Sequence, residues 1–374
     1  MIDAIKEKCD LLVRNRSEIL KKFSLQDSLM GIASGLIFTM NDQEADVEKM
    51  KECRKLLKKE TRPLSNLRAK TELILLSKMA MAEDPGLYLT DVLDVYKKVC
   101  HGKILEDSYM VLAAILIVDF GRKDESEEIV TKAGELMKRL NKIHPFLTDS
   151  DDTSYVMLLA LTDKSIDSIV ADVDEGYRYL KKTPKLRVKT NALFELCEAL
   201  AVSYGDMKDK CDKAVRIYRV FAARRAPFGT EHEFASLCPL VDVDMEPETI
   251  VDEILETEAI LERANGFDDK SMDRKKRMMY ATLLLADVCG RDPASVNDTL
   301  ISNPVISNTI SILKAKQVSL MMSVAGSIFQ TAMSIASAMA SEEDSEKTSE
   351  EKSEQSSEEE SKPFSEDVSK QPSK

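Results

Sequence analysis

The segment YMVLAAILIVDFGRKDESEEIVTKAGELMKRL, residues 109–140, shows the pattern that decides the fold. Its first part, residues 109–118, is apolar on every side, as expected for a helix enclosed by neighbouring helices. Asp119 ends that run, a short polar turn follows, and residues 127–140 then place apolar side chains at helical spacing with lysines on the opposite face. The segment therefore predicts a buried helix, a turn and an amphipathic outer helix.

The same pattern recurs along the chain with a period of about 41 residues. Apolar stretches end in an aspartate again and again, and the first and last of these aspartates lie six periods apart. Strand-like alternation is essentially absent, and repeats of this length are typical of stacked helical hairpins. We therefore predict an all-α fold, a helical-hairpin repeat solenoid of about seven hairpins of about 41 residues, with these turn aspartates: Asp42, Asp84, Asp119, Asp163, Asp206, Asp242 and Asp287.

The sequence divides into four predicted regions. Residues 1–23 form an amphipathic helix that is expected to cap the open end of the first hairpin, and residues 24–304 form the repeat domain. Residues 305–340 are rich in small residues and methionine and are predicted to form a coiled-coil-like C-terminal helix. Residues 341–374 contain 12 acidic and 5 basic side chains and ten serines, which predicts a disordered acidic tail.

Composition bounds the class of protein. Asp and Glu outnumber Lys and Arg by 66 to 53, which gives a net charge of −13 and indicates an acidic soluble protein. Seven cysteines without paired spacing, and an N-terminus that is charged from its third residue, predict a reducing cytoplasm. The apolar runs of the repeats reach only about 7 to 12 residues, whereas a transmembrane helix needs about 20.

The search for chemistry finds two clusters and no catalytic signature. His144, Asp149, Asp151 and Asp152 form the densest group, and His232 opens a second one. The first group falls on a repeat boundary, so helix capping and turn formation explain it better than a ligand site. The motifs GxxxxGK[ST], GxGxxG, GxSxG, HExxH and CxxC are absent from the sequence. We therefore predict no cofactor, metal or catalytic residue, and the sequence favours a protein that is not an enzyme.

Charged surfaces offer two further interpretations. The turn aspartates would line up along one edge of a solenoid and could bind a basic partner, although helix capping is the simpler explanation. Basic clusters could form a phosphate-binding stripe, but the acidic total and the shortage of interleaved aromatic residues disfavour nucleic acid. The clusters are Lys181, Lys182, Lys185, Arg187 and Lys189, then Arg216, Arg219, Arg224 and Arg225, and finally Arg274, Lys275, Lys276 and Arg277.

Residues 317–340 carry no charge. The favoured interpretation is a closing helix packed on the last hairpin. The first alternative is a helix that binds a partner or a second copy through close contact of small residues and adaptable methionines. The second, membrane association, is disfavoured because the segment holds internal serines and no basic cluster follows it. The candidate interaction residues are Met321, Met322, Ile328, Phe329 and Met333.

Several segments together resemble a known family. These are NRSEILKKF at residues 15–23, HPFLTDSDD at residues 144–152, KKRMMYATLLLADV at residues 275–288, and the serine- and alanine-rich C-terminal helix. They are similar to an uncharacterised family of bacterial cytoplasmic proteins known only as a domain of unknown function, over about residues 1–340. The resemblance implies a bacterial, intracellular, all-helical protein. The resemblance implies no catalytic residues.

The sequence therefore favours a protein-interaction scaffold or adaptor that binds a protein partner on the surface of stacked hairpins. One alternative is an enzyme or a small-ligand or metal-binding protein with a site in the helical concavity near His144, His232 and the turn aspartates. Another is a peripheral membrane or self-assembly protein that acts through residues 317–340.

Overall fold

The computed structural model describes residues 2–24, 28–69, 71–101, 108–145, 147, 153–202, 205–267 and 272–289. These residues fall within one compact unit, Met1–Ser327. Helices and turns account for their regular structure, and no strand occurs among them, so the predicted all-α class is confirmed. The predicted C-terminal helix at 305–340, with Met321, Met322, Ile328, Phe329 and Met333, lies outside these residues, as does the predicted tail at 341–374.

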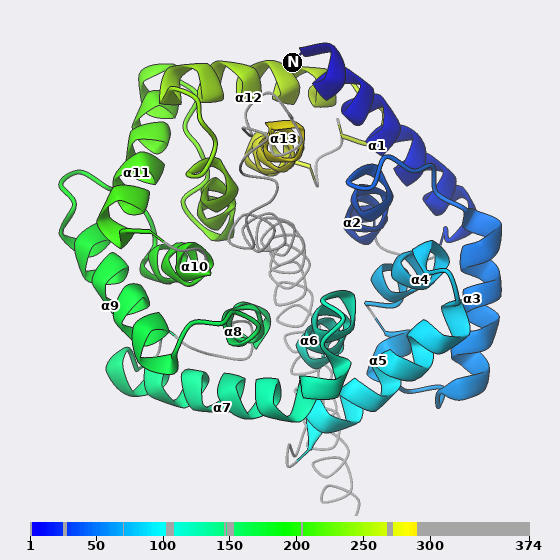
Figure 1. Ribbon diagram of the computed structural model, residues 1–374. Helices are drawn as coiled ribbons and strands as arrows, with labels where there is room; N and C mark the ends of the chain where they lie inside the picture. Colours follow the sequence, from blue (N-terminus) through cyan, green and yellow to red (C-terminus); the bar gives the residue numbers. More distant parts are fainter. Residues whose placement is uncertain are drawn as a thin grey trace, which may run out of the picture. The chain divides into compact units, whose positions relative to one another are not determined.

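The helices form an outer and an inner set (Figure 1). The two sets alternate along the chain, and an outer helix comes first. The outer set consists of α1 (Ile2–Lys22), α3 (Val47–Glu60), α5 (Pro85–Cys100), α7 (Ser126–Ile143), α9 (Ile166–Lys182), α11 (Met207–Ala223) and α12 (Pro247–Glu262). The inner set consists of α2 (Ser28–Thr39), α4 (Glu72–Met81), α6 (Ser108–Asp119), α8 (Thr153–Ala160), α10 (Thr190–Ala201), the 3₁₀ helix η4 (His232–Leu240) and α13 (Arg274–Cys289).

The apolar runs of the sequence form the inner helices. In α6, every side chain from residue 111 to residue 117 is buried, as the pattern of this segment predicts. The outer helices bury only one face. In α9, for example, Ile169, Val173, Tyr177 and Leu180 are buried, whereas Lys181 is exposed. Burial of apolar surface in the inner set is therefore the main source of stability.

Among the described helices, none combines the length and the apolar character that crossing a bilayer requires.

The outer helices contact one another in chain order, and the last of them, α12, contacts the first, α1. Helix α1 also contacts α13 (Figure 1). Within this unit the succession of helices therefore closes on itself. Most outer helices pack extensively against the inner helix that follows them, whereas the sequence pattern predicts that each inner helix pairs with the outer helix after it. The difference arises because turn signals locate the ends of helices without stating which neighbour each helix packs against.

The N-terminal helix makes the closing contacts. The ammonium group of Lys8 in α1 is buried and lies 2.6 Å from Asp42 and 2.8 Å from Asp287 of α13. It also donates to the Thr39 carbonyl oxygen at the end of α2, at 2.8 Å. One cation thus joins the first inner helix to the last one.

A second contact closes the same junction. The guanidinium of Arg16 lies 5.9 Å from the centre of the Phe267 ring, in the loop after α12. Gly266 has a φ of +86°, and a Cβ there would lie 1.8 Å from Nη1 of Arg16, so this position requires glycine. The loop between α12 and α13 is therefore shaped to receive a side chain from α1.

Four outer helices each carry a lysine that contacts the end of the next inner helix. In each case its ζ-nitrogen donates to a carbonyl oxygen at or just beyond the C-terminal end of the following inner helix, where unpaired carbonyls favour a cation. Burial lowers the pKa of the Lys132 and Lys213 amines. The pairs are Lys8 with Thr39 at 2.8 Å, Lys49 with Ala82 at 3.0 Å, Lys132 with Thr162 at 2.6 Å, and Lys213 with Val243.

The cysteines remain thiols, and none forms a disulfide. Burial raises the pKa of Cys9 to about 12 and that of Cys53 to about 11, so neither is a reactive thiolate at neutral pH.

We predict that Lys8→Met lowers the free energy of unfolding by about 3 kcal/mol, because it leaves the buried Asp287 carboxylate without its cation. Chemical denaturation followed by circular dichroism measures the change. Lys6→Met on the exposed face of the same helix is the matched control and is expected to change stability by no more than about 0.5 kcal/mol. Equal stability of the two variants would contradict the role given to Lys8.

Candidate interaction surface

His144 is the only one of the predicted ligand residues whose side chain the structure describes. It ends α7, and its Nε2 lies 2.9 Å from Oδ1 of Asp174 in α9. The same Asp174 oxygen accepts a hydrogen bond from Nε of Arg178 at 2.9 Å. The imidazole packs edge-on against Tyr177 and Phe194, with ring centres 4.7 and 5.4 Å away. These contacts join α7 to α9 and α10 and give His144 a structural role.

The structure describes no contact between His144 and the other predicted ligand residues. Asp149, Asp151, Asp152 and the side chain of His232 lie outside what the structure describes. Within the described part of the chain, no three His, Cys, Asp or Glu side chains converge in a way that could hold a metal ion.

The turn aspartates serve the helix ends. Asp84 caps α5 by accepting hydrogen bonds from the amides of Gly86 and Leu87, at 2.8 and 3.0 Å. Asp206 caps α11 in the same way. Others pair with lysines, as Asp42 does with Lys8. The capping explanation is therefore confirmed for Asp84 and Asp206.

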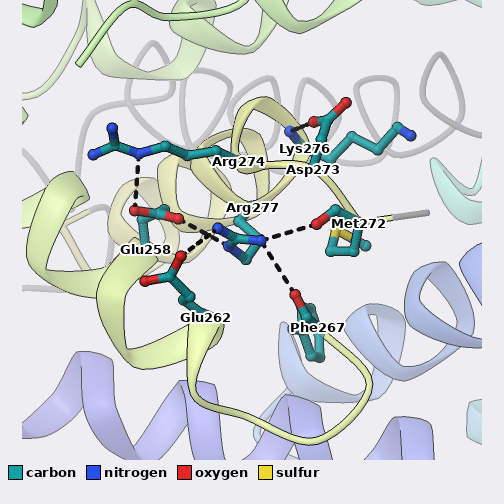
Figure 2. A network of polar contacts seen from close by, with 8 residues as sticks. All are labelled: Glu258, Glu262, Phe267, Met272, Asp273, Arg274, Lys276 and Arg277. Carbon is teal, nitrogen blue, oxygen red and sulfur yellow. Dashed lines mark hydrogen bonds and ion pairs between the residues drawn. The ribbon is translucent and has the colours of Figure 1, made fainter. Parts of the chain in front are cut away.

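In the basic cluster at the start of α13, the last member, Arg277, has a structural role (Figure 2). Nε of Arg277 donates to Glu258 at 2.8 Å, and one of its terminal nitrogens donates to Glu262 at 2.9 Å. The other terminal nitrogen donates to the carbonyl oxygens of Met272 and Phe267, at 2.9 and 3.4 Å. The Arg277 guanidinium is thereby occupied by internal partners, and it holds the loop between α12 and α13.

The remaining two basic clusters lie close together. One runs from the end of α9 through residues 183–189, and the other lies on the second half of α11 and the residues that follow it. Their side chains are exposed, in contrast to Arg277. We call the following residues the cationic surface: Lys181, Lys182, Lys185, Arg187, Arg216, Arg219 and Arg225.

Three hydrogen bonds hold the two halves of the cationic surface together. The hydroxyl of Tyr179 in α9 donates to Asp212 in α11 at 2.6 Å, and this bond raises the pKa of the tyrosine. Nη2 of Arg219 donates to the Pro184 carbonyl oxygen at 3.2 Å. The amide of Lys189 donates to the Thr230 carbonyl oxygen at 3.0 Å. The two loops therefore form one continuous surface.

Acidic partners neutralise only part of this region. Lys189 lies 2.6 Å from Glu231, and Arg224 forms a bidentate pair with Asp252, both distances being 2.8 Å. Lys181 lies over the Tyr177 ring at 5.4 Å. By contrast, no side-chain hydrogen bond or ion pair to a described residue occurs for these exposed cations: Lys182, Lys185, Arg187, Arg216 and Arg225. Positive charge is thus concentrated on one surface of a protein with a net charge of −13.

Two of these cations adopt a backbone conformation that normally favours glycine. Lys185 has a φ of +60° and Arg225 a φ of +57°. Lys185 occupies the third position of a turn in which the Leu186 amide donates to the Thr183 carbonyl oxygen at 3.5 Å, and Arg225 follows the last turn of α11. Non-glycine residues in this region carry strain and are enriched at functional sites.

Exposed arginine and lysine side chains are suited to the recognition of anions. Arginine binds carboxylate and phosphate through parallel hydrogen bonds, whereas lysine acts as a mobile point charge. The sequence identified both basic clusters but contains no local signal that the loops meet, because their contact depends on the packing of α9 against α11.

Comparison with known proteins identifies a family whose function is unknown. Residues 15–318 match the family described as "Protein of unknown function (DUF4003)". No curated protein and no solved structure matches the chain.

We predict that Lys185→Gly leaves the free energy of unfolding within about 1 kcal/mol of the original value, because glycine adopts a positive φ readily. Lys185→Val should instead lower it by about 1 to 2 kcal/mol, because a β-branched side chain is strained in this conformation. Chemical denaturation of both variants measures the effect. Similar stability of the glycine and valine variants would show that residue 185 does not hold the left-handed conformation in solution.

Proposed function

The chain belongs to the DUF4003 family, whose function is unknown, and we propose that it is a protein-interaction scaffold whose binding site is the cationic surface. The partner is a cytoplasmic protein with an acidic surface. The scaffold is a helical-hairpin repeat of about 41 residues, as the sequence predicts.

The repeat interpretation is supported by the recurring lysines. Lys8 and Lys49 are 41 residues apart, and Lys132 and Lys213 follow after 83 and 81 residues, about two periods each. Each makes the same contact with the end of an inner helix. A side chain that recurs at a fixed period with a fixed contact is expected of repeated units.

The single observation that carries the proposal is the contrast between buried and exposed charge. Buried cations such as Lys8 and Arg277 are held by internal carboxylates and carbonyl oxygens. The cationic surface instead exposes several cations that have no such partners among the described residues. Exposed charge of one sign attracts a partner of the opposite sign and accelerates association.

The alternatives lack such support. For an enzyme or small-ligand protein, the described candidate is His144, which is enclosed by aromatic rings and hydrogen-bonded to Asp174. A membrane or self-assembly role would act through residues 317–340, which lie outside the described residues. We therefore retain the scaffold as the proposed function.

Co-purification from native cells tests the proposal. The variant Lys182→Glu/Arg216→Glu reverses two exposed cations of the cationic surface. The control variant Lys55→Glu/Lys58→Glu makes the same change in net charge on the exposed face of α3. We expect the original chain and the control to recover a partner in near-stoichiometric amounts, and the first variant to lose most of it.

Two outcomes would contradict the proposal. If the original chain recovers no partner, the scaffold function is wrong. If both variants recover the partner equally well, binding occurs elsewhere on the protein.

A further inference from the structure

We propose that Asn265 is a site of spontaneous covalent modification. The backbone nitrogen of Gly266 attacks the side-chain amide of Asn265, expels ammonia and closes a succinimide ring. The site lies in the loop after α12, at the junction with α1, and the inference is independent of the cationic surface.

The sequence supplies the reacting pair only once. Asparagine is followed directly by glycine at residues 265 and 266 and nowhere else in the chain. In the reaction the Gly266 nitrogen must approach Cγ of Asn265, and a Cβ on residue 266 would hinder this approach. Glycine has no Cβ and its backbone rotates more freely than that of other residues. Asparagine is a thermolabile residue, and Asn265 is expected to be the most labile one in this chain.

The structure presents Asn265 in a turn. The Phe267 amide donates to the Ala264 carbonyl oxygen at 3.0 Å, which places Asn265 and Gly266 at the two central positions. Gly266 has a φ of +86°, close to the value that a type II turn requires at its third position. The Asn265 side chain is exposed and makes no hydrogen bond or ion pair with a described residue. Its amide group can therefore rotate toward the backbone, and water can reach the product.

Arg16 places a positive charge beside the reacting atoms. A Cβ on Gly266 would lie 1.8 Å from Nη1 and 2.2 Å from Cζ of Arg16, so the guanidinium lies against the Gly266 backbone. The Gly266 nitrogen must lose its proton to act as a nucleophile, and negative charge then passes to the side-chain oxygen of Asn265. A cation next to developing negative charge lowers the barrier. Arg16 therefore promotes ring closure through its charge.

The reaction needs no oxidant and no cofactor. A bond forms between the Gly266 nitrogen and Cγ of Asn265, and the bond from Cγ to Nδ2 breaks. The side-chain nitrogen leaves as ammonia and carries away the proton that Gly266 has lost. Water then opens the ring. Attack at Cγ gives aspartate, whereas attack at the main-chain carbonyl carbon gives isoaspartate.

Isoaspartate would weaken the closing junction. It adds one atom to the main chain before Gly266 and therefore displaces Phe267. The Phe267 ring lies 5.9 Å from the Arg16 guanidinium, and its carbonyl oxygen accepts a hydrogen bond from Nη1 of Arg277 at 3.4 Å (Figure 2). These contacts connect the loop with α1 and α13, so a displaced Phe267 would loosen both connections.

Timed incubation of the full-length protein at mildly alkaline pH tests the proposal. Samples are digested, and mass spectrometry follows the peptide that contains residue 265. We expect the mass change from an amide to a carboxylic acid to accumulate there. The enzyme that methylates isoaspartyl residues should label the product. The rate should rise with pH, because the nucleophile forms by loss of a proton. Asn265→Gln should abolish the change at this position, because the longer side chain would have to close a larger ring.

Matched variants test the role of Arg16. Arg16→Met should slow the modification by about fivefold, whereas Arg16→Lys keeps the charge and should slow it by less than about twofold. Arg14→Met removes an exposed cation from the same helix and should leave the rate unchanged. Circular dichroism checks that each variant is folded. If Arg16→Met fails to fold, concentrated salt screens the charge in the original protein and should slow the reaction instead.

The stability of the product tests the effect on the junction. Protein with isoaspartate at residue 265 should unfold at a lower denaturant concentration than Asn265→Asp, which has the same charge and a main chain of normal length. Equal midpoints would show that the junction tolerates the longer chain.

Two results would overturn the inference. The first is an unmodified residue 265 after a period in which the peptide LERANGFDD, residues 261–269, is fully converted. The second is an equal or higher rate in Arg16→Met than in Arg14→Met, which would refute the contribution of Arg16.

Discussion

The structure depends on one buried ammonium group. Lys8 of the first helix lies between the end of α2, where it meets the Thr39 carbonyl oxygen and Asp42, and Asp287 of α13. A charge removed from water is costly unless opposite charges and hydrogen bonds surround it, so this lysine stabilises only the arrangement in which all three partners are present. It couples helices from the two ends of the described chain. Arg16 and the glycine-dependent loop at Gly266 strengthen the same junction. The first and last helices are therefore expected to unfold together.

Two populations of charge have different roles. Four lysines of the outer helices occupy the carbonyl ends of inner helices, and Arg277 is held by two glutamates and two carbonyl oxygens. These groups stabilise the fold and have little capacity left for a ligand. The cations of the cationic surface are exposed, and two of them, Lys185 and Arg225, have a positive φ. The fold thus uses its buried charges internally and leaves one group of cations exposed, and this contrast is the basis of the proposed interaction surface.

The sequence predicted what depends on local pattern. Apolar runs such as residues 109–118 specified buried helices, and Asp84 and Asp206 were recognised as helix caps because capping involves only neighbouring residues. The contact between Lys8 and Asp287 could not be predicted, since the two residues are 279 positions apart and neither has an unusual local sequence. The two basic clusters could be identified in the sequence. Their contact could not, because it depends on the packing of α9 against α11. The positive φ of Lys185 could not be predicted from the sequence Thr-Pro-Lys-Leu. Turns with a positive φ at the third position usually have glycine or asparagine there, and this turn has lysine. The predicted roles of Asp149, Asp151 and Asp152 stay predictions.

Hydrogen–deuterium exchange of the full-length protein, alone and in complex with the partner recovered by co-purification, tests most directly whether the two basic clusters form one binding surface. The account predicts slower amide exchange in both residues 181–189 and residues 216–226, with no comparable change in α3 or α5. Protection of only one of these two segments, or protection centred on another pair of helices, would contradict it.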